Sequence, residues 1–209
     1  MIFYDCPTAP SPRRARMFIA EKGLDIETRQ VDLGKGEQLS PEFLAVNPLA
    51  TVPVLVTDSG ITIGENVAIA TYLEATHPEP PLMGVTPDER AQVMMWNSII
   101  DQQCAMPVAD VLRNSHPKMA DRALPGPDNF GQIPELAARG KARVDIFYSR
   151  LEDQLQGRDF LAIDQFSLAD ISAFVIAEFA AQVRMPIPEN NVATLAWHAR
   201  IAERPSATV

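Results

Sequence analysis

Two short stretches of the sequence carry residue types that suit the binding of a peptide-like ligand. In the first, residues 47–55 (Asn-Pro-Leu-Ala-Thr-Val-Pro-Val-Leu), Pro53 opens an apolar run typical of a central strand. Proline is normally excluded there because it has no N–H for the ladder. A cis Val52–Pro53 bond would turn the backbone so that Val52 pairs, strand-like, with an extended peptide. An edge strand with an ordinary trans proline fits the same residues.

The second stretch is Glu65 and Asn66, at the start of a predicted helix. The first turn of a helix has free N–H groups and the positive end of the helix dipole, and both attract a carboxylate. Simple capping of the helix by Asn66 explains the same residues. On its own, the pair therefore indicates either an anion site or a helix cap.

Most other familiar catalytic motifs are absent from the sequence. There is no Gly-x-x-x-x-Gly-Lys-Ser/Thr phosphate loop, no Gly-x-Gly-x-x-Gly dinucleotide motif and no Gly-x-Ser-x-Gly nucleophile elbow. The three histidines, His77, His116 and His198, are far apart and none lies in a metal-ligand spacing. We therefore expect neither a metal nor a nucleotide cofactor.

The N-terminal part of the chain predicts a small α/β domain of order βαβαββα, which would position both stretches. Its helices are expected from Ser11, as the N-cap before Pro12, to a stop at Gly23, then from Ser40 to before Asn47, and finally over 65–76. Its strands are expected at residues 2–4, 26–31, 52–56 and 61–63, the last two joined by a hairpin turn.

Three prolines within residues 77–81 interrupt this pattern and suit an extended linker. We therefore predict two domains, residues 1–77 and 87–209, joined by a linker over 78–86. Residues 116–134, rich in Pro, Gly and Asp, predict a long loop in the second domain. Helices are expected there over 88–113, with an interruption at Pro107, and over 135–156, 167–183 and 192–203.

The composition of the chain limits the classes of partner that it can bind and the compartment in which it is expected. The 209 residues include 27 acidic against 18 basic ones, and the net charge of −9 opposes binding to nucleic acid or to an anionic membrane. No apolar run approaches the roughly 20 residues that span a bilayer, and the first residues lack the features of a signal peptide. Cys6 and Cys104 are too few for a disulfide framework. We expect a cytoplasmic protein.

The order and spacing of these features resemble the cytosolic glutathione transferases over essentially the whole chain. In that family, a thioredoxin-like domain carries a cis-proline in an Asn-Pro-x-x-x-Val-Pro stretch, followed by a Glu-Ser pair at the next helix, a proline-containing linker and an all-helical domain. Residues 13–23, 166–171 and 197–205 also match, and Ser167 with Asp170 matches the family's capping box. The resemblance implies an α/β thioredoxin-like domain followed by an all-α domain.

The resemblance also implies a glutathione site in the first domain. The segment Thr51–Pro53 would hold the cysteinyl unit through the backbone of Val52, with Pro53 in cis. Glu65 and Asn66 would hold the γ-glutamyl end, although Asn66 stands where the family has serine; its amide can still donate. Gln38 would contact the glycyl carboxylate, with Lys35 as a second candidate.

The family lowers the pKa of the glutathione thiol with a donor at the N-terminus of the first helix, because only the thiolate attacks. Ser11 is the first candidate for that donor and Thr8 the second. Tyr4 also carries a hydroxyl, whereas Cys6 would indicate mixed-disulfide chemistry. Arg13 would add local positive charge.

The function implied is conjugation of glutathione to a small hydrophobic electrophile, by a homodimer. The electrophile site would be lined by residues 101–113 and by the 116–134 loop, and Asp101 or Gln102 would reach the partner subunit's glutathione. The adaptable side chains Met94, Met95, Met106 and Met119 lie in or near this region. The alternatives are a glutathione-dependent peroxidase or disulfide reductase, and a non-catalytic interaction module.

Overall fold

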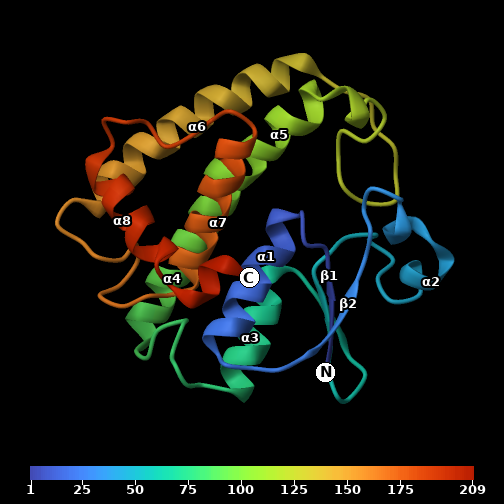
Figure 1. Cartoon of the computed structure of the whole chain (residues 1–209), viewed down its shortest axis with the longest axis horizontal. Coiled ribbons are helices and arrows are strands. Elements are labelled where there is room, and N and C mark those ends of the chain that lie inside the picture. The colour runs from blue at the N-terminus through green and yellow to red at the C-terminus, as the bar shows by residue number, and fades with distance from the viewer. The chain divides into compact units, whose positions relative to one another are not determined.

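The computed structural model describes all 209 residues and divides into two compact units (Figure 1). The first comprises residues 1–80 with 124–129 and Val209, and the second comprises 81–123 and 130–208. The predicted fold class is confirmed: a thioredoxin-like α/β unit and an all-helical unit. Residues 124–129, which the sequence places in the helical domain, cluster with the first unit. Gly126 packs there, where an added Cβ would lie 3.7 Å from the carbonyl oxygen of Leu49.

The first unit is built on a four-stranded mixed sheet of order β2–β1–β3–β4. Strand β1 runs parallel to β2 and antiparallel to β3, which pairs antiparallel with β4. Strand β3 begins at Val54 and not at Val52 as predicted, because Pro53 has no N–H to give to the ladder. The bounds are β1 (Ile2–Asp5), β2 (Glu27–Gln30), β3 (Val54–Val56) and β4 (Thr62–Gly64).

Helices α1 and α3 pack side by side on one face of the sheet, and the short helix α2 lies on the other (Figure 1). Helix α1 begins earlier than predicted. Ala9 is the N-cap and Pro10 takes the first helical position, so Ser11 lies inside the first turn. Gly23, with φ +62°, ends the helix as predicted. The bounds are α1 (Pro10–Glu21), α2 (Pro41–Leu44) and α3 (Asn66–Thr76), with a 3₁₀ turn over Glu37–Leu39.

The second unit is all helical and is organised around α7, which is buried along most of its length. The predicted capping box is confirmed at its start, where Ser167 and Asp170 cap each other. The indole N–H of Trp197 also donates to Asp170, at 2.9 Å. The elements are α4 (Pro87–Ile100), a π-helical turn (Asp101–Ala105), α5 (Met106–Ser115), α6 (Pro134–Leu155), α7 (Leu168–Gln182) and α8 (Val192–Ala202), with 3₁₀ turns over Pro117–Met119 and Pro205–Thr208.

Pro107 interrupts the long predicted helix, as expected. In the π-helical turn the N–H of Met106 bonds to the carbonyl of Asp101. The next acceptor in this wider register is the carbonyl of Gln102, but its donor would be Pro107, which has no N–H. The guanidinium of Arg143 in α6 donates to that carbonyl instead. The interruption is therefore a widened turn whose orphaned carbonyl is paired by a neighbouring helix.

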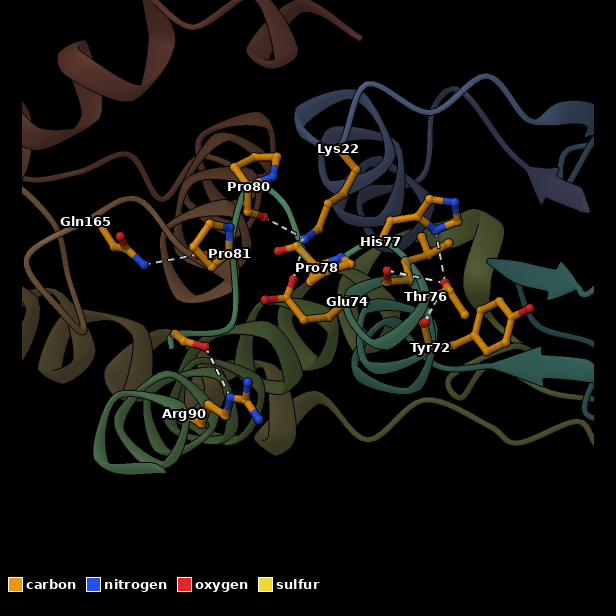
Figure 2. A network of polar contacts seen from close by, with 12 residues as sticks. Lys22, Tyr72, Glu74, Thr76, His77, Pro78, Pro80, Pro81, Arg90 and Gln165 are labelled. Atoms are coloured by element: carbon orange, nitrogen blue, oxygen red, sulfur yellow. Dashed lines mark hydrogen bonds and ion pairs between the residues drawn. The ribbon is translucent and has the colours of Figure 1, made fainter. Parts of the chain in front are cut away.

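The C-terminal segment of the first unit is bonded to a buried lysine (Figure 2). The side chain of Lys22, at the C-terminus of α1, is 0% exposed, and its ammonium lies 2.6 Å from the carboxylate of Glu74 in α3. The ammonium also donates to the carbonyl oxygens of Pro80 at 2.6 Å and Pro78 at 3.3 Å. These acceptors match the three N–H bonds of an ammonium. Lys22 thus ties the segment after α3 to the helices that carry the candidate site.

Replacing Lys22 with methionine should lower the free energy of unfolding by about 3–5 kcal/mol, because it leaves the partly buried carboxylate of Glu74 and two carbonyls without their cation. Urea denaturation followed by circular dichroism measures this. The double variant K22M/E74Q should recover part of the loss. K35M breaks the exposed Lys35–Asp32 pair and should leave the midpoint nearly unchanged. Equal midpoints for K22M and K35M would contradict the role of Lys22.

Candidate functional site

The loop between β1 and α1 is held by one arginine. Arg16 in α1 pairs with the carboxylate of Asp5, and it donates to the carbonyl oxygens of Cys6 and Pro7, each at 3.3 Å. Gln30 of β2 donates to the second oxygen of Asp5 at 3.0 Å. Because Asp5 is 2% exposed, its carboxylate depends on these donors. The network therefore fixes the path of the chain from the sheet into α1.

In the first turn of α1, a single residue, Ser11, supplies the free hydrogen-bond donors. The first N–H groups of a helix have no partner within the helix. In α1 the residues on either side of Ser11 are Pro10 and Pro12, which have no N–H. Ser11 therefore supplies the backbone N–H and the hydroxyl of this turn, at the positive end of the helix dipole. It is half-buried.

Asn66, the first residue of α3, meets Ser11 directly. Its amide Nδ2 donates to Ser11 Oγ at 2.7 Å. Asn66 is 8% exposed, and its Oδ1 is buried without a hydrogen-bond partner. Glu65, the N-cap of α3, has φ +63° and is exposed. The structure thus joins the N-termini of α1 and α3, and with them two residue groups that the sequence left separate.

The segment Thr51–Pro53 leads into β3, and its Val52–Pro53 bond is cis. Val52 lies outside the ladder, because pairing with β1 begins at Val54. The preceding loop is shaped by Asn47, whose amide donates to the carbonyl and hydroxyl oxygens of Thr51 at 2.8 and 3.2 Å. This role of Asn47 was not predicted from the sequence. An asparagine before a proline is a typical turn signal and could have indicated it.

The two candidates for the glycyl carboxylate differ in their surroundings. The ammonium of Lys35 lies 3.1 Å from the carboxylate of Asp32 and is exposed. Hydrogen bonding to Asp32 raises the pKa of Lys35, and the same contact lowers the pKa of Asp32. Gln38 is half-buried, and its Oε1 is a buried atom without a partner. Lys35 thus already has a partner within the protein, whereas Gln38 has a polar atom without one.

The other residues that the sequence offers for thiol activation contact residues other than Ser11. Thr8 is exposed, and its hydroxyl lies 3.5 Å from the sulfur of Cys6, which is 3% exposed. Tyr4 points to the α2 side of the sheet, where its ring packs edge-on against Phe43 with centroids 5.8 Å apart. It lines a cavity of about 420 Å³ there, together with Arg29.

Comparison with known proteins now adds to this geometry. Family models of the glutathione S-transferase N-terminal and C-terminal domains match residues 8–76 and 111–205. The chain is 36% identical to glutathione S-transferase 2 of Saccharomyces cerevisiae over 211 residues, which cover 99% of this chain and 87% of that protein. The chain belongs to the glutathione S-transferase family. The recognition from sequence is confirmed.

Solved structures of relatives agree with this family assignment. The crystal structure of Gtt2 from Saccharomyces cerevisiae superposes with a TM-score of 0.91 at 34% identity, covering 100% of this chain and 99% of that one. A glutathione S-transferase domain-containing protein from Marinobacter aquaeolei VT8 superposes with a TM-score of 0.89 at 35% identity, covering 99% of each chain. Glutathione is the substrate that this family uses.

In the helical unit of this glutathione S-transferase family member, the sequence candidates lie on and near the π-helical turn. Asp101 accepts a bond from the amide of Asn97 at 3.1 Å, and the exposed Gln102 donates to Ser98 Oγ at 3.0 Å. Cys104 is buried, and burial raises its pKa to about 12. It is therefore protonated and unreactive.

No helix of the structure has the length and apolar character that a membrane crossing requires.

Arg16 was not predicted as a functional residue, because it lies 9 to 11 residues from its partners and no local motif marks it. Arg16→Met should lower the free energy of unfolding by about 3 kcal/mol, because it leaves the buried Asp5 carboxylate without its cation. It should also speed amide hydrogen exchange in residues 5–9, which mass spectrometry resolves. R29M, at an exposed pair with Glu27, is the control. A loss no larger than that of R29M would contradict the role of Arg16.

Proposed function

We propose that this protein is a glutathione transferase that joins the glutathione thiolate to a small hydrophobic electrophile. The observation that carries the proposal is the 2.7 Å bond between Asn66 and Ser11. It joins a helix N-terminus suited to a carboxylate with a hydroxyl suited to a thiolate. Glutathione carries both groups, in its γ-glutamyl and cysteinyl units.

Each end of glutathione has a set of matching residues. The γ-glutamyl carboxylate binds the free N–H groups at the start of α3, while Glu65 and the buried Oδ1 of Asn66 accept from the ammonium. The cysteinyl backbone pairs with the N–H and C=O of Val52, in the manner of an added strand. The amide of Gln38 donates to the glycyl carboxylate. The unpartnered buried Oδ1 of Asn66 supports the pairing with the ammonium.

The chemistry begins with loss of the thiol proton to solvent. A free thiol with a pKa near 8.5 is mostly protonated at neutral pH. The hydroxyl of Ser11 donates to the thiolate, and the N-terminus of α1 stabilises its charge, so the pKa of the bound thiol falls. The sulfur then forms a bond to an electrophilic carbon, and the leaving group departs with its electron pair. Ser11 keeps its own proton throughout.

The helical unit supplies the hydrophobic surface for the second substrate. Met95 and Met106 on α4 and α5 are 51% and 61% exposed, and methionine adapts to ligands of different shape. We also propose that the protein acts as a homodimer in the cytoplasm, the arrangement that the family resemblance implies. A two-fold dimer is the commonest assembly of soluble proteins.

Disulfide exchange through Cys6 receives less support. Thiol–disulfide chemistry needs an accessible thiolate, and the sulfur of Cys6 is buried next to the Thr8 hydroxyl. Conjugation needs no protein thiol, which is why we favour it.

Ser11→Ala should raise the pKa of bound glutathione toward its free value while leaving the affinity nearly unchanged. Loss of one charge-assisted hydrogen bond should lower kcat at neutral pH about 10- to 100-fold. Calorimetric titration with reduced glutathione gives the affinity, thiolate absorbance against pH gives the pKa, and a dinitrophenyl halide reports conjugation.

Ser59→Ala, at an exposed serine in the β3–β4 turn, is the matched control and should behave as wild type. If T8A and not S11A raised the pKa, Thr8 would be the activating hydroxyl. If wild-type protein bound no glutathione, the proposed function would be wrong.

A further inference from the structure

We propose that Asn66 is a positioning residue that directs the hydroxyl proton of Ser11 toward the thiolate. The inference rests on the proposed function and concerns a position where this chain departs from the Glu-Ser pair of the family pattern. A serine at position 66 has a side chain too short to place the same group against Ser11. The asparagine amide reaches it at 2.7 Å.

The direction of this hydrogen bond decides what Ser11 can do. A hydroxyl has one proton to donate and two lone pairs that accept. Because the Asn66 amide donates, it fills a lone pair of Ser11 Oγ and leaves the proton for another acceptor. Donation into Oγ also polarises the O–H bond and makes it a stronger donor. A side chain that accepted from Ser11 would instead consume the proton needed by the thiolate.

The orientation of the Asn66 amide follows from the surroundings of its oxygen, Oδ1. Its Oδ1 is buried and has no donor from the protein, and a buried acceptor left unpaired costs free energy. A donor from the ligand, the ammonium of the γ-glutamyl unit, completes that oxygen when glutathione binds. With Oδ1 occupied, the amide can turn only Nδ2 toward Ser11.

The surroundings of Ser11 leave the sulfur few other donors. Pro10 and Pro12 flank it, so the first turn of α1 presents no other N–H that would compete for the sulfur. The hydroxyl, its backbone N–H and the Asn66 amide therefore form one donor group. Within this group Ser11 touches the thiolate, and Asn66 acts through Ser11.

The test is a double-mutant cycle on the pKa of bound glutathione. Asn66→Ser should raise that pKa by about one unit and lower kcat/KM at neutral pH about tenfold, with the glutathione affinity changed less than about threefold. Asn66→Asp should raise it further, because a carboxylate accepts the Ser11 proton and adds negative charge. In the S11A background, Asn66→Ser should have no further effect on the pKa.

The outcomes separate this inference from the proposed function. If S11A raises the pKa but N66S shifts it equally in both backgrounds, Asn66 does not act through Ser11, although the transferase function stands. If N66S weakens glutathione binding and leaves the pKa unchanged, its role is only to bind the ligand. If wild-type protein does not lower the thiol pKa, the proposed function itself fails.

Discussion

The carboxylate of Asp5, buried at the end of β1, must find donors inside the protein, and the candidate site depends on how it does so. Arg16 reaches back from α1 to pair with it and to bind the carbonyls of the intervening loop. Gln30 completes the set from β2. Because an unpaired buried charge is strongly destabilising, the start of α1 has little freedom relative to the sheet. That restriction places Ser11 where Asn66 of α3 can meet it.

The same requirement recurs at three other places where a helix ends or breaks. Lys22 satisfies the carbonyls of Pro78 and Pro80 after α3. Arg143 pairs the carbonyl that Pro107 leaves without a donor. Glu152 of α6 accepts from the N–H groups of Ala193 and Thr194 at the start of α8, at 3.0 and 2.9 Å. In each case a long side chain from another segment supplies what the local backbone lacks. Tertiary structure, more than local capping, therefore sets these helix ends.

This explains which features could be predicted from the sequence. Strands, helices and the interruption at Pro107 follow from local patterns, so the fold class was predicted correctly. The start of α1 was wrong by two residues because Pro10 and Pro12 both suit the first turn of a helix. Ser11 and Asn66 were each identified, but their contact spans 55 positions in the chain and no local pattern encodes it. Arg16 and Lys22 were missed for the same reason.

The acidic character of the chain bears on how it would hold an anionic ligand. With a net charge of −9, the protein repels glutathione at long range, and the ammonium of Lys35 is already paired with Asp32. The candidate site compensates with backbone N–H groups at two helix N-termini and with neutral amides and hydroxyls. Such donors stabilise negative charge without a cation. Because these donors act over hydrogen-bond distances, ionisation of the sulfur would depend on the exact positions of Ser11 and Asn66.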